Sequence, residues 1–287
     1  MQLVQLKAMN QRSIGAILVD AGKISPIDAE KILREQKHSN LRFGDAAFKL
    51  GLLNQDDIKF ALARQFEYPY LKHGDKTISE EVVSAFNPFS PIVEQLRAVR
   101  TQLMLRWFDV DARHKSLTIV SPSAGEGRSF IAANLAVVFS QLGERTLLID
   151  ADLRNSRQQK LFNTGKSPGL SAVLSDRCAP EDAVVKIESL LGLSVLPAGA
   201  SPPNPQELLS RPSFSAILES YSEAYDVILI DTPAATASAD AQTIASRAGA
   251  ALLVTRINMT PIAAVETLTT NLRNSNVAVV GSLLNGT

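Results

Sequence analysis

Residues 121–129 have the composition of a phosphate-binding loop. They read Ser-Pro-Ser-Ala-Gly-Glu-Gly-Arg-Ser, and they lie between an apolar run that predicts a strand and a pattern that predicts a helix. Gly125 and Gly127 allow backbone N–H groups to turn toward an anion, and the positive end of the following helix points at the same place. The hydroxyl of Ser129 is placed to hold Mg²⁺. This loop is therefore the first candidate for the site of chemistry.

The loop departs twice from the G-x-x-x-x-G-K-[ST] pattern of nucleotide-binding loops. Pro122 stands at the first glycine, and Arg128 stands at the lysine. A guanidinium can grip phosphate through two hydrogen bonds, yet it is larger than an ammonium and follows a moving phosphate less readily. Taken alone, the loop could also be a tight turn with no ligand. The sequence predicts nucleotide binding here and leaves turnover open.

Two further segments are apolar strands that end in carboxylates. Residues 146–154 contain Asp150 and Asp152, and residues 227–233 contain Asp231. The carboxyl ends of parallel strands meet at one edge of a sheet, which is where a Mg-nucleotide site needs oxygen ligands. An isolated aspartate at a strand end is better explained by a helix cap or a turn. Three such segments in this order favour a nucleotide site.

The order of these motifs resembles that of a known family. Gly-Glu-Gly-Arg-Ser at 125–129, Leu-Leu-Ile-Asp-Ala-Asp-Leu-Arg at 147–154 and Val-Ile-Leu-Ile-Asp-Thr-Pro at 227–233, with Pro-Pro-Asn-Pro-Gln-Glu-Leu-Leu at 202–209, are similar to the bacterial tyrosine kinases of exopolysaccharide chain-length control. These kinases are P-loop proteins related to the ParA/MinD ATPases. Paired carboxylates in the middle segment mark the kinase group, and Ser123 stands where the ParA/MinD branch normally has an additional lysine. The chain therefore resembles the kinase branch.

This resemblance covers about residues 90–287 and implies ATP and Mg²⁺ as cofactors. The loop amides and the guanidinium would hold the β- and γ-phosphates, and one aspartate would take the proton of the tyrosine hydroxyl. The implied catalytic residues are Arg128, Asp150 (the base) and Asp152. The implied metal ligands, direct or through water, are Ser129, Asp152 and Asp231. The implied nucleotide-binding residues are Gly125, Glu126, Gly127, Arg128, Ser129, Phe130 and Asn285.

Asn285 enters this set because related ATPases have an asparagine after the last strand that touches the adenine. An ordinary turn asparagine ahead of Gly286 explains the residue equally well. Both interpretations remain open from the sequence.

A helix upstream of the loop has the pattern E-x-x-R-x-x-R, which these kinases use to pack subunits into a ring. The spacing places Glu94, Arg97 and Arg100 along one helix face. The resemblance thus implies a homo-oligomer. It also implies a membrane chain-length-determinant protein as the partner that supplies an activating cytoplasmic segment. A solvated helix face would give the same pattern without any interface.

An internal repeat occupies the N-terminal part of the chain. Residues 13–36 align without gaps with residues 42–65, and each unit predicts a short helix, a glycine turn and a capped second helix that ends in Gln. The pair resembles the MshEN domain of type II secretion ATPases, which binds cyclic di-GMP. The resemblance implies candidate ligand residues at the start of each unit: Arg12, Gly15, Arg42 and Gly44. A serine, Ser13, replaces the first unit's opening arginine. A helical docking module without a ligand is the alternative.

Composition excludes several other functions. Lys+Arg and Asp+Glu are both 29, so there is no electrostatic case for a nucleic-acid partner. One cysteine and three dispersed histidines offer neither a disulfide framework nor a metal cluster. No run approaches a membrane-spanning length, and the N-terminus lacks a signal-like core. We expect a cytoplasmic protein without direct membrane insertion, peripheral to the inner membrane through its partner.

The pattern of elements predicts an α/β fold with a doubly wound, mostly parallel sheet, preceded by a small, mainly helical domain. Predicted strands lie at 116–120, 145–150, 193–197, 226–231, 250–256 and 277–284, and predicted helices lie at 129–142, 205–222, 239–247 and 261–274. The expected domains are residues 1–71 (the MshEN-like domain), 72–90 (a linker) and 91–287 (the P-loop kinase domain).

The expected function is ATP-dependent protein tyrosine phosphorylation that regulates exopolysaccharide polymerisation and export. These kinases usually phosphorylate a tyrosine-rich C-terminal tail, whereas the four tyrosines here are Tyr68, Tyr70, Tyr221 and Tyr225. The substrate would then be another protein. The alternative is a ParA/MinD-like regulatory ATPase that switches the assembly of the export machinery.

Overall fold

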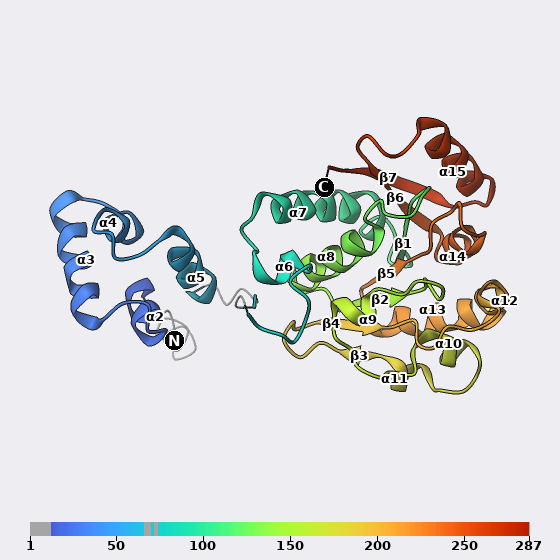
Figure 1. The fold of residues 1–287 in the computed structure, drawn as a ribbon, viewed down its shortest axis with the longest axis horizontal. Coiled ribbons are helices and arrows are strands. Elements are labelled where there is room, and N and C mark those ends of the chain that lie inside the picture. Colours follow the sequence, from blue (N-terminus) through green and yellow to red (C-terminus); the bar gives the residue numbers. More distant parts are fainter. Residues whose placement is uncertain (1–12, 66–69, 72–73, 287) are drawn as a thin grey trace. The chain divides into compact units, whose positions relative to one another are not determined.

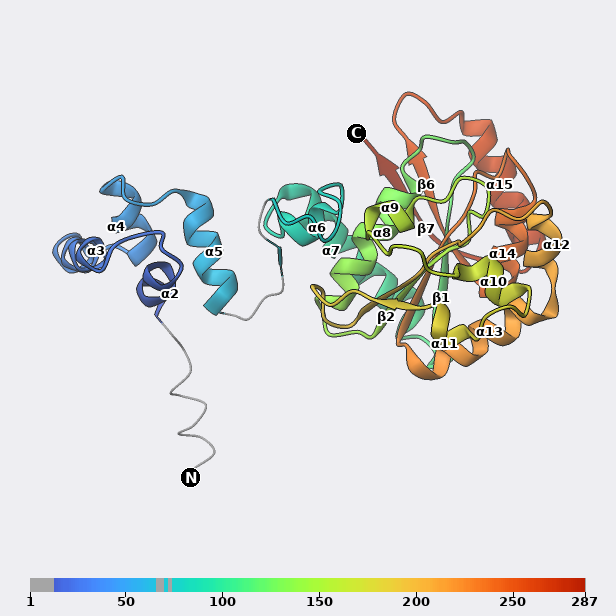
Figure 2. The same cartoon turned by 60° about the horizontal axis from the view of Figure 1, so that its bottom comes forward.

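The computed structural model describes residues 13–65, 70–71 and 74–286. The chain divides into two compact units, Met1–Pro69 and Tyr70–Thr287, each of which is drawn in Figures 1 and 2. Each unit has hydrophobic clusters of its own, so each is described separately.

The first unit is a pair of helix-turn-helix repeats, as the sequence predicts. Its helices are α2 (Ile14–Asp20), α3 (Pro26–Ser39), α4 (Phe43–Lys49) and α5 (Gln55–Gln65). Gly22 and Gly51 follow the short helices with φ of 67° and 66°, a left-handed backbone that glycine adopts without strain. Ser25 caps α3, while Asn54 and Asp57 bond each other's backbone N–H at the start of α5. The helix α3 continues to Ser39, three residues beyond the predicted Gln.

The second unit is built on a seven-stranded sheet with the order β3-β4-β2-β5-β1-β6-β7. Every adjacent pair for which the register is given is parallel except β3 with β4. The strands are β1 (Ser116–Val120), β2 (Thr146–Asp150), β3 (Val185–Lys186), β4 (Leu193–Leu196), β5 (Val227–Asp231), β6 (Ala250–Arg256) and β7 (Ala278–Asn285). The six predicted strands are present within one residue at each end, and the short antiparallel β3 is additional.

Alternate residues of the central strands enter cores on opposite faces of this sheet. Leu117 and Ile119 belong to one cluster with helices of the first face, whereas Ile228 and Ile230 belong to a cluster on the second. The first face is covered by α6 (Val83–Phe86), α7 (Pro91–Leu103), the π-helix η1 (Met104–Phe108) and α8 (Arg128–Ser140). The second face is covered by α10 (Gly169–Leu174), α12 (Pro205–Ser210), α13 (Pro212–Ala224), α14 (Asp240–Ala248) and α15 (Ile262–Asn274). Two short helices, α9 (Gln158–Leu161) and α11 (Pro180–Ala183), lie in the connections.

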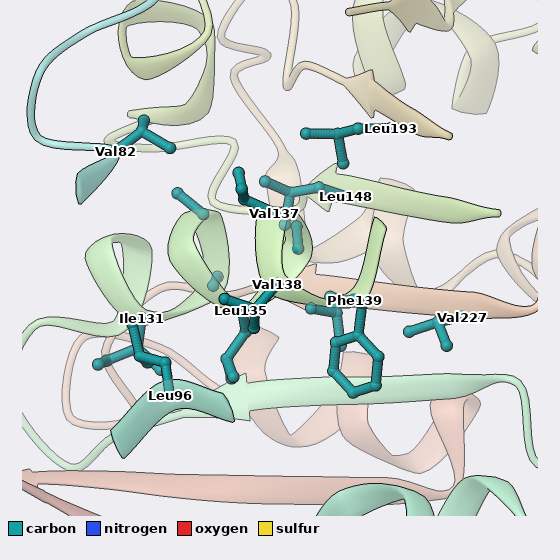
Figure 3. Close-up of a cluster of buried hydrophobic side chains, with 14 of the residues drawn as sticks. Val82, Leu96, Ile131, Leu135, Val137, Val138, Phe139, Leu148, Leu193 and Val227 are labelled. Atoms are coloured by element: carbon teal, nitrogen blue, oxygen red, sulfur yellow. The ribbon is translucent and has the colours of Figure 1, made fainter. Parts of the chain in front are cut away.

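Helix α8 is the most enclosed of these helices, with apolar side chains on every side. Figure 3 shows Val137 directed toward Leu148 and Leu193 of the sheet, and Ile131 next to Leu96 of α7. A helix that is apolar all round must be buried on both its sheet face and its outer face. The start of α8 is therefore held rigidly at the edge of the sheet.

Two predicted elements differ from the observed ones. The helix predicted at 205–222 is divided into α12 and α13, because Arg211 precedes Pro212 and adopts an extended backbone with ψ of 145°. The expected linker at 72–90 belongs, from residue 74 on, to the second unit. Val82 and Phe86 enter the core that surrounds α8. The sequence did not predict this burial, because the segment begins with polar residues.

No helix within the described ranges combines the length and the apolarity needed to cross a membrane.

The burial of Phe86 leads to a stability prediction. Phe86→Ala should lower the free energy of unfolding of the second unit by about 3–5 kcal/mol, since Phe86 is only 3% exposed. Phe89→Ala is the matched control, and because Phe89 is 39% exposed its cost should be about 1 kcal/mol. Thermal and denaturant unfolding measure both. Equal and small effects would mean that the segment is a linker after all.

Candidate nucleotide-binding site

The three predicted motif segments meet at the carboxyl edge of the sheet. In the strand order β2-β5-β1, Asp150 lies beside Asp231, and Ile119 of β1 pairs with Asp231 from the other side. The loop 121–127 therefore begins beside the end of β5, and the end of β2 lies one strand further along the same edge. After β5, the N–H groups of Ala235 and Thr236 donate to the carbonyls of Ser121 and Pro122, which fixes the base of the loop.

The loop itself has the backbone geometry of an anion site. Gly125 and Gly127 have φ of 79° and 97°, values that other residues adopt only with strain. Gly127 is the N-cap of α8, and no side chain caps that helix. Its first N–H groups and its dipole thus face the loop interior, where they can bind a phosphate.

Arg128 points into the protein rather than toward the loop mouth. Its Nε donates to the carbonyl of Thr232 at 2.8 Å, and its Nη1 donates to the carbonyl of Ser123 at 2.8 Å and to the hydroxyl of Ser121. The side chain is buried. In this arrangement the guanidinium ties the start of the loop to the end of β5, and reaching a γ-phosphate would require it to leave these acceptors.

Glu126 stabilises the loop through hydrogen bonds to Ser123 and to the segment that follows β6. Its carboxylate accepts the N–H of Ser123 at 2.7 Å and the hydroxyl of Thr260 at 2.5 Å, while Arg256 donates to the carbonyl of Gly125 at 3.0 Å. The loop that follows β6 is thereby connected to the phosphate loop. The Glu126 side chain faces inward, so its contribution to a nucleotide would come from the backbone.

Asn285, the adenine candidate, lies against the phosphate loop. Its Nδ2 donates to the carbonyl of Glu126 at 3.1 Å, and a Cβ added to Gly127 would come within 2.3 Å of that nitrogen. The φ of 97° at residue 127 favours glycine, and the close approach of Asn285 leaves little room there for a side chain. Phe130, also expected at the nucleotide, packs partly buried against the core of the first face.

Asp150 organises the loop that follows β2. Its carboxylate accepts the backbone N–H groups of Asp152, Arg157 and Gln158 at 3.2, 3.0 and 2.9 Å. The carboxylate is fully buried, and burial together with the neighbouring Asp231 raises its pKa well above the ordinary range. In this conformation the expected proton acceptor has no exposed surface and shapes the loop.

Asp231 is the carboxylate that best fits a metal. One oxygen accepts the amide of Gln158 at 2.7 Å, and the other, Oδ1, is buried without a hydrogen-bond partner in the described structure. Burial raises the pKa of Asp231 to about 6, although the Gln158 amide, the Ser129 hydroxyl and Arg128 act in the opposite direction. A buried anionic oxygen without a donor fits a cation. Mg²⁺ in nucleotide sites takes one or two carboxylates together with phosphates and waters, and Ser129, Asp152 and Asp231 can supply such a set.

Sequence reasoning missed two residues that connect these segments. Gln158 joins Asp231 to the carbonyl of Ser129, and Arg154 donates to Asp240 at 2.8 Å across the gap between the loop after β2 and the start of α14. Asp240 is buried, so its carboxylate depends on this pairing. Arg154 belongs to the recognised Asp-Ala-Asp-Leu-Arg segment. No signal in the sequence indicates that it pairs with Asp240, which lies 86 residues away.

The helix face proposed as an interface is partly engaged within the chain. Arg97 pairs with Glu94, and Arg100 donates to the carbonyl of Val138 in α8 at 2.7 Å. The side chain of Glu94 is 64% exposed, that of Arg97 only 17%.

Of the described cyclic di-GMP candidates in the first unit, only Gly15 lines a hollow. Gly15 lines a hollow of about 520 Å³ together with Gln36, Phe43 and Gln65 from the other helices. A Cβ at Gly15 would meet the Phe43 ring at 3.3 Å, and one at Gly44 would meet Ile58 at 3.2 Å, so close packing of the repeats also explains both glycines. The remaining candidates are Arg42, at the N-cap of α4 without a capping side-chain bond, and Arg12, which lies outside the described residues.

Comparisons with known proteins agree with this geometry. A family model described as an AAA domain matches residues 114–277. Tyrosine-protein kinase YwqD of Bacillus subtilis is 35% identical over 215 residues, which cover 75% of this chain and 90% of YwqD. The solved kinase domain of the Escherichia coli tyrosine kinase ETK is 30% identical with a TM-score of 0.69, covering 75% of this chain and 82% of that one.

The fold is also shared with an ATPase of another kind, and the chain matches only part of its longer relatives. The cell division ATPase MinD of Pyrococcus furiosus shares the fold at 26% identity with a TM-score of 0.54, covering 60% of this chain and 72% of that chain. Several other curated relatives are much longer, and the chain spans 26% to 30% of their length. The AAA-domain match and the similarity to YwqD over nearly its whole length show that the chain belongs to the bacterial tyrosine-protein kinase family, with a P-loop domain of the kind also found in MinD.

Proposed function

We propose that this protein is an ATP-dependent protein tyrosine kinase. The observation that supports this most directly is the meeting of the uncapped start of α8 with Asp231, whose Oδ1 is buried without a donor, at one sheet edge. Phosphoryl transfer asks a protein mainly to position nucleotide, metal and acceptor and to offset charge. Relatives named tyrosine-protein kinases match 71% and 75% of the chain.

Within this proposal, each residue has a definite task. The amides from Gly125 to Ser129 bind the phosphates, and Ser129, Asp152 and Asp231 hold Mg²⁺, which when bound neutralises phosphate charge. Asp150 accepts the tyrosine proton only after the loop 152–158 releases its carboxylate. Asn285 lies where it can meet the base.

The wider setting is proposed from the family resemblance. The kinase would regulate exopolysaccharide polymerisation and export and would be cytoplasmic. It would associate with the inner membrane through a chain-length-determinant protein that supplies an activating segment. The exposed Glu94 carboxylate on α7 supports a homo-oligomer, in which Arg97 and Arg100 would exchange some of their present contacts for a neighbouring subunit.

A regulatory ATPase that switches assembly is the second candidate, and the orientation of Arg128 favours it. A guanidinium that already satisfies Ser121, Ser123 and Thr232 stabilises the loop without requiring catalysis. This candidate needs nucleotide binding, but no phosphotyrosine.

For the first unit we propose cyclic di-GMP as a regulatory ligand. The hollow beside Gly15 is large enough for a small molecule, and it gathers a glycine and two glutamines from separate parts of the repeat. Arg42 would pair with a guanine or phosphate. A protein-docking module remains the alternative for this unit.

Incubation with Mg-ATP followed by phosphotyrosine detection tests the kinase proposal. The chain, or an added tyrosine substrate, should become phosphorylated, and Arg128→Lys should raise the rate by about tenfold if roughly 1.4 kcal/mol of transition-state stabilisation is gained. A compact ammonium can move with the γ-phosphate, whereas the guanidinium is held by three acceptors. Arg177→Lys, an exposed change of the same type, is the control. Nucleotide binding without phosphotyrosine in either protein would favour the assembly switch.

Asp231→Asn should stabilise the apo protein while removing its response to Mg-nucleotide. Because the folded-state pKa of Asp231 is raised to about 6 from 3.8, the folded state binds the proton more tightly, and the free energy of unfolding falls as pH rises between about 4 and 6. The variant should regain up to about 3 kcal/mol at pH 8. Thermal unfolding with and without Mg-ADP measures both effects.

Asp226→Asn is the control of opposite sign for this experiment. The hydrogen bond from Arg145 lowers the pKa of Asp226 to about 2, so its ionised form contributes stability above the unfolded pKa that is lost as pH falls. This variant should be less stable at pH 8 and should keep the Mg-ADP response. If Asp231→Asn behaves in the same way, Asp231 has only a structural role.

Titration of the protein with cyclic di-GMP tests the first unit. We expect saturable binding below about 100 μM, with GTP as the negative control. Gln36→Leu, which changes the lining of the hollow, should weaken binding about tenfold, the effect of losing a strong hydrogen bond. Gln55→Leu, an exposed position in the same unit, should not. Absence of binding in this range would leave a docking module.

A further inference from the structure

Gln158 joins all three segments of the candidate site, yet it belongs to none of their motifs. It is the first residue of α9 and is fully buried. Its backbone N–H donates to Asp150 at 2.9 Å, and its side-chain nitrogen donates to Asp231 at 2.7 Å and to the carbonyl of Ser129 at 3.1 Å. One residue thus contacts the phosphate-loop helix and both carboxylate-bearing strand ends.

The amide has used both of its donors, while its acceptor has found no donor. The side-chain nitrogen has two hydrogens, and two acceptors take them. Its oxygen, Oε1, is buried with no hydrogen-bond partner in the described structure, and the same is true of Asp231 Oδ1. The opposite amide orientation would place an oxygen against the Asp231 carboxylate, so the assignment is fixed by its neighbours.

These two oxygens belong to side chains that are joined by a hydrogen bond of 2.7 Å between their other polar atoms. Both are acceptors, so neither can satisfy the other. Leaving a buried acceptor unpaired costs stability, and in native proteins such a group usually indicates a missing donor or ion. The groups that fit such oxygens are donors, such as water, and cations. A hydrated Mg²⁺ provides both, since it binds carboxylate directly and keeps several waters.

We propose that Gln158 is a positioning residue of the metal site, resting on the Mg-nucleotide function proposed above. Its amide holds one oxygen of Asp231 so that the other faces the metal, and its own carbonyl oxygen accepts a hydrogen bond from a metal-bound water. The backbone bond to Asp150 sets the position of the amide. The loop after β2 would thus contribute to the metal site in the conformation that these bonds hold.

Isothermal calorimetry with ADP, in Mg²⁺ and in EDTA, tests this role. Gln158→Met keeps the length and volume of the side chain but removes its donors and its carbonyl oxygen. We expect about a tenfold loss of ADP affinity in Mg²⁺ and less than about a twofold change in EDTA. A Mg²⁺ titration at fixed ADP should show a half-saturating concentration about ten times higher than that of the parent protein. Gln159→Met is the matched control, because the amide of Gln159 donates to Gly165 instead.

The outcomes separate the possible roles. Equal losses in Mg²⁺ and EDTA, or unchanged affinity in Mg²⁺, overturn the positioning role while the parent still binds Mg-ADP. A parent protein without Mg-dependent nucleotide binding overturns the proposed function itself, and this inference with it. If thermal unfolding shows that Gln158→Met is not folded at the assay temperature, Gln158→Asn, which withdraws the same amide by one methylene, is judged by the same criterion.

Discussion

Two aspartates buried side by side at one sheet edge determine most of the site's geometry. The register of β2 and β5 places Asp150 opposite Asp231, and neither has exposed surface. Carboxylates in such an environment must be protonated, paired or hydrogen-bonded. Asp150 meets this requirement because its carboxylate accepts hydrogen bonds from three backbone N–H groups of the following loop. That loop therefore folds back over the sheet edge and brings Gln158 to Asp231.

The phosphate loop obeys the same constraint with one buried side chain of each charge. Arg128 is buried against the carbonyls of Ser123 and Thr232, and Glu126 is buried against the N–H of Ser123 and the hydroxyl of Thr260. The loop is thus held in its conformation by its own charged side chains. A phosphate would first meet backbone amides and the positive end of α8, which need no rearrangement. A phosphate could contact Arg128 only if the arginine gave up hydrogen bonds that stabilise the loop. Nucleotide binding and phosphoryl transfer would therefore make different demands on this site.

The sheet and the strand-end aspartates could be predicted because each depends on local pattern and on topology. A buried parallel strand is a short apolar run, and parallel strands bring their carboxyl ends together whatever lies between them. The direction of Arg128 could not be predicted, since it depends on acceptors such as Thr232, which is 104 residues away. Gln158 had no local signal, because its position follows from the bonds to Asp150. The burial of Val82 and Phe86 was not predicted, because the segment that precedes them is polar.

The buried carboxylates form an arrangement that a cation would stabilise. Asp231 keeps one buried oxygen without a donor, and the raised pKa values of Asp150 and Asp231 mean that their ionised forms oppose folding near neutral pH. A metal bound through Asp231 would restore that balance and stabilise the closed loop after β2. The ion pair of Arg154 with Asp240 connects that loop to the start of α14. The kinase and the assembly switch proposed above would both bind nucleotide at this site. They differ in whether the closed loop later frees Asp150 for an incoming hydroxyl, which makes the bonds from residues 152–158 to Asp150 the point at which the two functions diverge.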